Sequence, residues 1–107
     1  MEAALNENVL RVGALEIRPL EYTALAGGRP LQLTVRELDL LTALAERRGR
    51  IVSREELYAA VWDEEYRKTD RSVDVYIARL RQKLAEAIPG CPYIHTHFGF
   101  GYRLSPE

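Results

Sequence analysis

Residues 71–87 combine the side chains in this sequence that are best suited to recognising another molecule. At 100° per residue, four apolar residues fall within an arc of about 60° and predict a core-facing stripe: Val73, Ile77, Leu80 and Leu84. The opposite arc holds polar or small residues and no carboxylate: Arg71, Ser72, Val75, Ala78, Arg79 and Gln82. Arginine and glutamine bond bidentately to base edges, and small residues permit close approach. The pattern favours a helix that reads a DNA groove, with a solvated amphipathic helix as the alternative.

The rest of the sequence gives little indication of a metal site or a catalytic site. Cys91, His95 and His97 share one strand parity, but Pro92 interrupts the strand and no fourth ligand is evident. The glycines near the C-terminus sit in a predicted hairpin instead of before a helix, and no serine or cysteine has an identifiable base partner. We therefore expect no metal, no cofactor and no enzymatic activity.

Short alternating runs precede the helical part of the chain and predict a small antiparallel sheet with one buried face. The four predicted strands cover residues 9–12, 15–18, 22–26 and 31–33. Gly27 and Gly28, between the last two runs, are typical of a tight hairpin. This sheet is the first of the elements that must position the residues of segment 71–87.

Two capping boxes predict two helices after the sheet. Thr34 with Glu37 begins the first, which is expected to stop at Gly49 and to bury Val35, Leu38, Leu41, Leu44 and Ala45. Ser53 with Glu56 begins the second, which is expected to end near Trp62 and to bury Leu57, Ala60 and Val61.

The C-terminal part of the chain reads as a third helix followed by a hairpin. Thr69 or Asp70 is expected to cap the helix, which extends to about Ala87. Residues 93–97 and 100–104 then alternate as two strands. The order of elements is therefore sheet, three helices and hairpin, without an internal repeat.

Length and composition indicate one soluble globular domain over residues 9–105, with residues 1–8 as a linker or disordered N-terminus. The chain has 107 residues, 47% of them hydrophobic and 29% charged. A single cysteine and no secretory signal favour the cytoplasm. The net charge of −1 argues against a nucleic-acid binder. The charge is uneven, however, because residues 1–65 hold 8 basic and 12 acidic side chains while residues 66–107 hold 7 and 4.

Several motifs together resemble the C-terminal effector domain of OmpR/PhoB-type response regulators. They are the run 49–57, the Val61-Trp62 pair, the stretch 70–77 with 79–84, and the closing Gly-Phe-Gly-Tyr-Arg-Leu of residues 99–104. The resemblance covers residues 9–104. It implies an α+β winged helix-turn-helix with a four-stranded antiparallel N-terminal sheet, three helices and a C-terminal β-hairpin wing.

The resemblance also implies DNA-binding roles for individual residues. Arg71 and Ser72 match phosphate contacts at the start of the recognition helix, Arg79 matches a base-reading arginine, and Arg81 matches a phosphate contact. Other matching positions are an aromatic beside the DNA backbone, Trp62, and two wing contacts, Thr96 and Tyr102. Val75 and Gln82 complete the exposed face of the predicted helix, and Phe98 the tip of the wing.

Some of these residues have alternative structural roles, and two depart from the family pattern. Ala78 and Phe98 stand where relatives usually carry arginines, which removes two cations that could hold DNA. Arg81 could instead pair with Asp74 or Glu86. Trp62 and Tyr102 could be packing groups, and the Phe98 ring could fold back against Tyr102 or Tyr93.

The expected partner is double-stranded DNA, with transcription regulation in a two-component system as the function. The resemblance implies direct-repeat sites bound by head-to-tail pairs of a domain that is monomeric when free, and a receiver domain in the full-length protein. It further implies that the loop after the second helix contacts RNA polymerase: Asp63, Glu64, Glu65, Tyr66, Arg67 and Lys68. The alternative is a winged helix that binds only proteins, which salt-independent behaviour toward duplex DNA would reveal.

Overall fold

The computed structural model describes residues 9–67 and 70–106, and this part of the chain contains two sheets, three α-helices and one short 3₁₀ turn, Pro19–Glu21. The predicted linker 1–8, the predicted cap Thr69 and the loop residue Lys68 lie outside the described residues. The N-terminal sheet pairs β1 (Leu10–Val12), β2 (Leu15–Arg18), β3 (Thr23–Ala26) and β4 (Arg29–Pro30) in antiparallel order. Helices α1 (Val35–Glu46), α2 (Arg54–Trp62) and α3 (Ser72–Ala87) follow, and β5 (Ile94–His97) pairs with β6 (Gly101–Leu104) as a hairpin.

The fourth strand is two residues earlier than the sequence pattern predicts. Gly27 and Gly28 both have positive φ and form a two-residue turn, so Ala26 pairs with Arg29 directly after it. The Leu31 amide donates to the Ala24 carbonyl, and the chain then leaves the sheet toward α1. Leu31 and Leu33 pack against the core without being part of a strand. Their alternation with Gln32 therefore reflects burial and not strand pairing.

The capping box at Thr34 and Glu37 is confirmed in both directions. The Thr34 hydroxyl accepts from the Glu37 amide, and the Glu37 carboxylate accepts from the Thr34 amide at 2.9 Å. Glu37 is only 2% exposed, and its Oε1 also accepts from Lys83 Nζ of α3 at 2.7 Å. Lys83 donates in addition to the Gln32 carbonyl. One buried carboxylate thus joins the start of α1 to α3 and to the segment leaving the sheet.

Two predicted details of the first helix are wrong. The helix ends at Glu46, before Gly49, because the Arg47 amide turns back to the carbonyls of Leu44 and Ala45. Val35 is exposed because it occupies the first helical position, outside the apolar face that packs under the sheet. The buried face instead contains Leu38, Leu40, Leu41, Ala43, Leu44 and Ala45.

The second helix has half of its predicted capping box. The Ser53 hydroxyl accepts from the Glu56 amide, but the Glu56 carboxylate turns away to Arg47 and Arg50 at 2.8 Å each. These two arginines lower the pKa of Glu56 to about 2. Ala60 is exposed, contrary to prediction, and Leu57 with Tyr58 supplies the buried side of α2.

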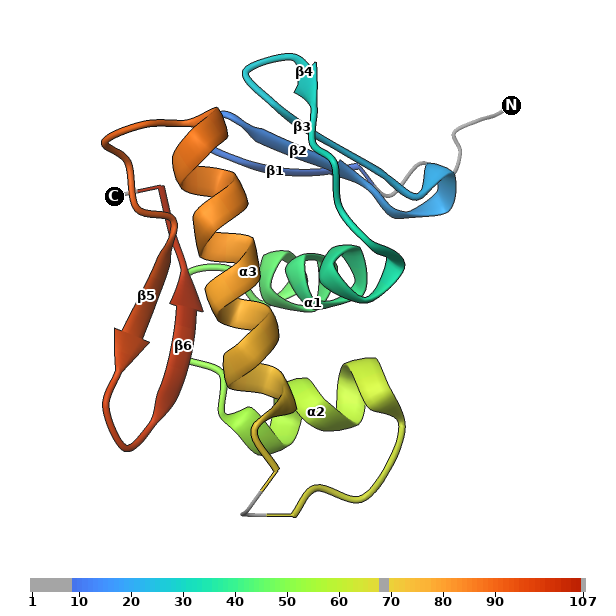
Figure 1. Cartoon of the computed structure of the whole chain (residues 1–107), viewed down its shortest axis with the longest axis vertical. Helices are drawn as coiled ribbons and strands as arrows, with labels where there is room; N and C mark the ends of the chain where they lie inside the picture. Colours follow the sequence, from blue (N-terminus) through green and yellow to red (C-terminus); the bar gives the residue numbers. More distant parts are fainter. Residues whose placement is uncertain (1–8, 68–69, 107) are drawn as a thin grey trace.

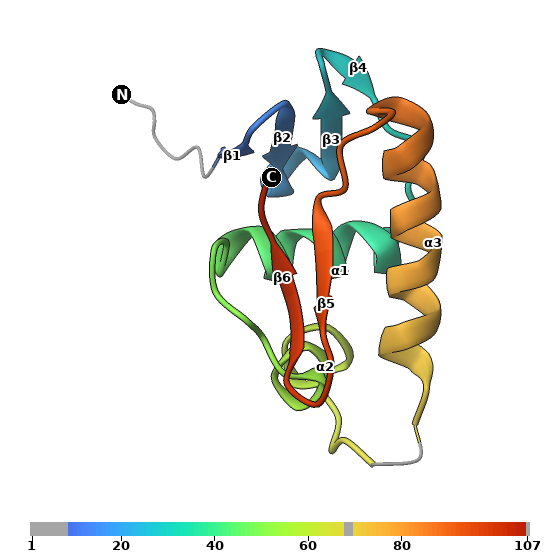
Figure 2. The ribbon, with the colours of Figure 1, turned by 90° about the vertical axis from the view of Figure 1, so that its left-hand side faces the viewer.

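Figure 1 shows α1 beneath the N-terminal sheet, α2 at the opposite end of the molecule, and α3 running past both helices. The hairpin β5–β6 lies alongside α3, and the 90° view of Figure 2 shows its turn at the level of α2. Val52 forms a bridge with Tyr102, so the segment before α2 pairs with β6 close to the turn of the hairpin. In the part of the chain that the structure describes, no helix is long and apolar enough to cross a membrane.

Candidate nucleic-acid interface

Helix α3 presents two faces, as its residue spacing predicts. Its stripe is buried: Val73, Ile77, Leu80 and Leu84 are each at most 3% exposed. Its opposite side faces solvent and contains Arg71, Val75, Ala78, Arg79 and Gln82. The Arg79 guanidinium stacks on the ring of Tyr76, 5.0 Å from its centroid. From Arg71 to Gln82 the exposed side therefore offers cationic, amide and small side chains. The prediction that this side carries no carboxylate is wrong at its C-terminal end, where Glu86 is exposed one turn beyond Gln82.

The start of α3 is held by Asp70, one of the two predicted caps. Arg71 occupies the position that begins the helix and makes no side-chain cap, whereas the Asp70 carboxylate accepts from the Ser72 amide at 2.7 Å. This backbone hydrogen bond and the Ser72 hydroxyl lower the pKa of Asp70. Arg71 keeps an exposed side chain, and Ser72 is half-buried.

Asp74 sits at the edge of the exposed side and joins three elements. Its Oδ1 accepts from Arg54 Nε of α2 at 2.7 Å and from the Tyr102 hydroxyl of β6 at 2.5 Å. Burial alone would raise the pKa of Asp74, but the hydrogen bonds from Tyr102 and Arg54 outweigh it and lower that pKa. Burial, together with the Asp74 charge, raises the pKa of Tyr102. Asp74 thus fixes α3 to both α2 and the hairpin.

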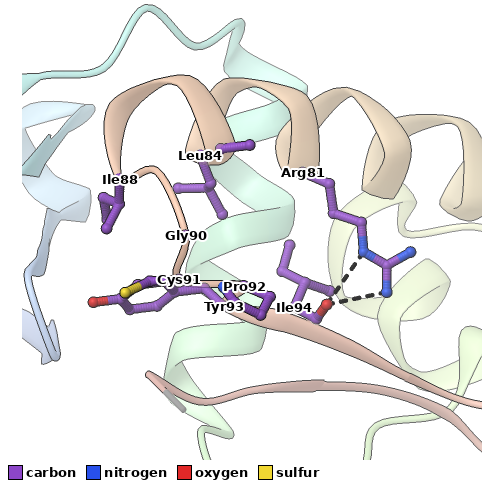
Figure 3. A pocket seen from close by; sticks show the side chains of 9 residues that line it. Arg81, Leu84, Ile88, Gly90, Cys91, Pro92, Tyr93 and Ile94 are labelled. Carbon is purple, nitrogen blue, oxygen red and sulfur yellow. Dashed lines mark hydrogen bonds between the residues drawn. The ribbon is translucent and has the colours of Figure 1, made fainter.

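Arg81 pairs with neither of the acidic partners that the sequence offered. Its Nε and Nη2 donate to the Ile94 carbonyl at 3.2 and 3.0 Å, and Nη2 also donates to the Thr96 hydroxyl. Figure 3 shows this guanidinium reaching from α3 to the start of β5. It closes one end of an apolar groove of about 340 Å³, which Leu84, Ile88 and Tyr93 help to line. Arg81 and Thr96 therefore connect the helix to the hairpin.

Trp62 lies in a cluster of aromatic rings at the end of α2. Its indole stacks on Tyr58 with ring centroids 5.0 Å apart and meets Tyr76 of α3 edge-on. The Arg36 guanidinium covers it at 4.9 Å and donates to the Val61 carbonyl. Trp62 is half-buried, so it packs while keeping part of its surface accessible.

Aromatic residues near the turn of the hairpin differ in exposure. Tyr102, which pairs with Thr96 two residues beyond Phe100, is 5% exposed and packs in the core. Phe98 and Phe100, which flank Gly99 in the turn, are 89% and 72% exposed. The predicted alternative that Phe98 folds back against Tyr102 or Tyr93 is therefore wrong.

The loop predicted to contact polymerase is described only over residues 63–67. Asp63 has a left-handed backbone with φ 53° and ends α2. All four charged residues of this segment, Asp63, Glu64, Glu65 and Arg67, are exposed. Glu64 also accepts a hydrogen bond from the Tyr58 hydroxyl at 3.2 Å, and Tyr66 packs edge-on against the Tyr58 ring.

Both histidines of the hairpin contact polar groups of the same domain. His95 Nε2 lies 3.3 Å from the Ser105 carbonyl oxygen, and His97 Nε2 accepts from Arg103 Nε at 3.1 Å. Cys91 is exposed. Over residues 9–67 and 70–106, no three histidine, cysteine or acidic side chains gather in a way that could hold a metal ion.

Sequence reasoning did not assign roles to Arg36, Arg54 or Phe100. Arg54 and Asp74 are 20 residues apart, and Arg36 and Val61 are 25 apart. Such separations lie outside any local spacing rule, so a single sequence carries no signal for these contacts. For Phe100, by contrast, the sequence does carry a signal. This residue stands beside the predicted turn, two residues after Phe98, and this spacing would have indicated an exposed pair of rings.

A four-stranded sheet, three α-helices and a terminal hairpin beside an exposed face of α3 define a winged helix-turn-helix domain. The family model described as "Transcriptional regulatory protein, C terminal" matches residues 28–104. The chain belongs to this family, which confirms the predicted resemblance to OmpR/PhoB-type response regulators.

Solved structures and curated relatives agree with this assignment. The crystal structure of the DNA-binding domain of CpxR from E. coli has a TM-score of 0.82 at 36% identity and covers 92% of this chain and 98% of that one. The Klebsiella pneumoniae RstA DNA-binding domain, solved in complex with the RstA box, has a TM-score of 0.81 at 35% identity, covering 94% and 99%. The alkaline phosphatase synthesis regulator PhoP of Bacillus subtilis is 37% identical over 98 residues, which are 92% of this chain and 41% of PhoP. The chain thus spans less than half the length of that curated relative.

Proposed function

We propose that this chain binds double-stranded DNA sequence-specifically, as the output domain of a two-component response regulator that controls transcription. The observation that carries the proposal is the solvent-facing side of α3, which holds Arg71, Arg79 and Gln82 over its first three turns, with the carboxylate of Glu86 one turn beyond Gln82. Membership of the family and the solved RstA complex with its DNA box support it. Helix α3 would occupy the major groove, with the hairpin as the wing at the backbone or in the neighbouring groove.

Each exposed residue of α3 has a role that its chemistry suits. Arg79 recognises a base, for which the bidentate guanidinium contact to guanine is the commonest choice. Gln82 and Val75 contact base edges further along the face, as an amide and an apolar group. Arg71 and Ser72, at the helix start, hold phosphates, where the amide ends of the helix also favour an anion.

Arg81, Thr96, Tyr102 and Trp62 contribute mainly by holding the interface together. The hydrogen bonds of Arg81 use Nε and Nη2, which leaves Nη1 as the donor for a phosphate. The Thr96 hydroxyl accepts from Arg81, and the Tyr102 hydroxyl donates to Asp74. Trp62 supplies ring surface beside the DNA backbone, and Phe98 contacts DNA at the wing tip.

The full-length protein would add a receiver domain to a winged-helix domain spanning residues 9–105. We propose a cytoplasmic, non-enzymatic regulator that is monomeric when free and binds direct repeats as a head-to-tail pair. Two modules are needed because one recognition helix spans few base pairs and single modules bury little surface. The loop 63–68 is proposed to contact RNA polymerase, and all four charged side chains among its described residues are exposed: Asp63, Glu64, Glu65 and Arg67.

Binding to duplexes selected from a random pool, measured against salt, tests the proposal. We expect a steep fall of affinity with salt, and a loss of about 1–3 kcal/mol on the selected site but not on random duplex for Arg79→Ala. Arg29→Ala is the charge-matched control, because Arg29 is exposed on β4 in the N-terminal sheet. Absence of salt-dependent binding would overturn the proposal in favour of a protein-binding winged helix. Equal losses on both duplexes would reassign Arg79 to phosphate contact.

A further inference from the structure

We infer that Phe98 and Phe100 form an apolar wedge that enters the minor groove of bound DNA and unstacks a base step beside the bases recognised by α3. This inference rests on the proposed function and adds a second mode of recognition to it. The two rings stand on either side of Gly99, which has φ 84°, and the Phe100 amide closes the turn on the His97 carbonyl at 2.8 Å. We call these two phenylalanines the wing-tip pair.

The wing-tip pair contributes little to the core. Phe98 and Phe100 are the only phenylalanines of the sequence, and they are 89% and 72% exposed. The rings of Tyr58, Tyr93 and Tyr102 in the same domain are at most 6% exposed. An aromatic side chain gains its largest stabilisation when its surface is removed from water. Two adjacent rings left in solvent therefore point to burial against a partner.

The hairpin holds the wing-tip pair in a fixed position relative to α3. Arg81 donates to the carbonyl and hydroxyl of two residues on β5, and the Tyr102 hydroxyl of β6 donates to Asp74. Close to the turn, Tyr102 and Val52 exchange two backbone hydrogen bonds of 2.7 and 2.9 Å. These contacts fix the position of the hairpin relative to α3 (Figure 2). If α3 lies in a major groove, the tip of the hairpin would therefore lie at the adjacent groove.

The charge of the hairpin segment itself matches a polyanion. Residues 87–106 contain no aspartate or glutamate, and Arg103 stands beside His97 on the strands that lead to the turn. Duplex DNA suits both the charge of Arg103 and the exposed rings, because its phosphates attract the cation and its minor groove admits apolar wedges between base steps. A second copy related by a two-fold axis would bring the same hairpin, which has no acidic side chain to meet the cation.

A wedge makes recognition depend on DNA stiffness. Pyrimidine–purine steps such as TA and CA unstack easily, whereas A-tracts resist deformation. We expect the protein to prefer a TA step over an A-tract at the wing position by about 5- to 150-fold, the range that one base-pair position usually contributes. The Phe98→Ala, Phe100→Ala double variant should bind both sequences alike.

The test uses 2-aminopurine placed in turn at each adenine flanking the bases protected by α3, on a duplex selected from a random pool. Wild-type protein should raise the fluorescence at one flanking step and bend the duplex, as seen by end-to-end energy transfer. The double variant should do neither. Leu20→Ala is the matched control, because Leu20 is 70% exposed in the turn Pro19–Glu21 of the N-terminal part. Thermal unfolding of all proteins should be alike, since each ring removed is exposed.

The outcomes separate this inference from the function on which it rests. Salt-dependent DNA binding with no fluorescence change and no bend would overturn the wedge and leave the proposed function intact. Failure of the wild-type protein to bind any duplex would overturn both. Concentration-dependent self-association that the double variant abolishes, without an effect on DNA shape, would assign the wing-tip pair to contacts between copies and overturn the wedge.

Discussion

Removing the Asp74 carboxylate should loosen the junction of α2, α3 and the hairpin by a predictable amount. Its two charge-assisted hydrogen bonds, from Arg54 and Tyr102, would each contribute about 1.5–3 kcal/mol if fully shielded from water. The Asp74 and Arg54 side chains are 28% and 38% exposed, so solvent screens that pair and the lower end applies. We expect Asp74→Ala to cost about 2–3 kcal/mol of unfolding free energy.

Tyr102→Phe removes one hydroxyl and should cost about 1 kcal/mol. The Asp74→Ala, Tyr102→Phe double variant should lose about 1 kcal/mol less unfolding free energy than the two single losses add up to. In Asp74→Ala alone the buried Tyr102 hydroxyl has no acceptor, whereas the double variant has no such hydroxyl. Urea denaturation measures the unfolding free energy of wild type, the two single variants and the double variant, provided that the m-value is the same for all four. Additivity within roughly 0.3–0.5 kcal/mol would refute the reasoning, because it would mean that Asp74 and Tyr102 do not interact.

The lowered pKa of Asp74 fixes the sign of the pH dependence. A carboxyl with a lower pKa in the folded protein contributes stability above its ordinary value of 3.8, and the contribution disappears as pH falls through the folded pKa. Wild type and Asp74→Ala should therefore differ most near neutral pH and converge in acid. A gap that stays constant into acid would contradict the pKa direction.

Four further outcomes are expected. Phe98→Arg should steepen the slope of log affinity against log salt by about 0.9, with an unchanged melting temperature because the ring is 89% exposed; an unchanged slope would place the tip away from phosphate. Gly101→Ala should cost more than about 2 kcal/mol, since φ is 139° and a Cβ would overlap a backbone carbonyl, whereas Gly99→Ala, with open space around it, should cost less; equal costs in urea unfolding would contradict this. Stability should fall as pH drops from 4.5 toward 2 and less so in Glu56→Gln, because the Glu56 pKa falls to about 2 on folding; identical acid unfolding curves would count against that ion pair. The free domain should sediment as a monomer, and a stable dimer without DNA would contradict the proposed assembly.

Sequence spacing predicted the elements whose contacts are local. The buried stripe of α3 follows from a 3.6-residue period, and the Thr34 capping box involves groups three residues apart. The same reasoning placed β4 two residues late, because burial of Leu31 and Leu33 produces the same alternation as a strand. Local pattern alone does not separate those two causes.

Side-chain partners were harder to predict than elements. Arg81 had two acidic candidates in its own helix, yet it bonds to a backbone carbonyl and a hydroxyl on β5, 13 and 15 residues away. The Asp74 contacts likewise join residues brought together only by packing of the helices and hairpin. The exposed residues of α3 were predictable because exposure follows from the position of the core stripe.

The buried Glu37 has a consequence for how the domain opens. Its carboxylate accepts from the Thr34 amide at the start of α1 and from Lys83 in the middle of α3, and Lys83 holds the Gln32 carbonyl of the chain leaving the sheet. None of these three segments can separate without exposing an unpaired charge, so their amide hydrogens should exchange with solvent as one cooperative unit. The turn of the hairpin and residues 63–67 make no such contact, so their amides should exchange through small local openings. The start of α1, the middle of α3 and the segment that leaves the sheet would therefore open only together, while the hairpin turn and residues 63–67 open residue by residue with the strands β5 and β6 still paired.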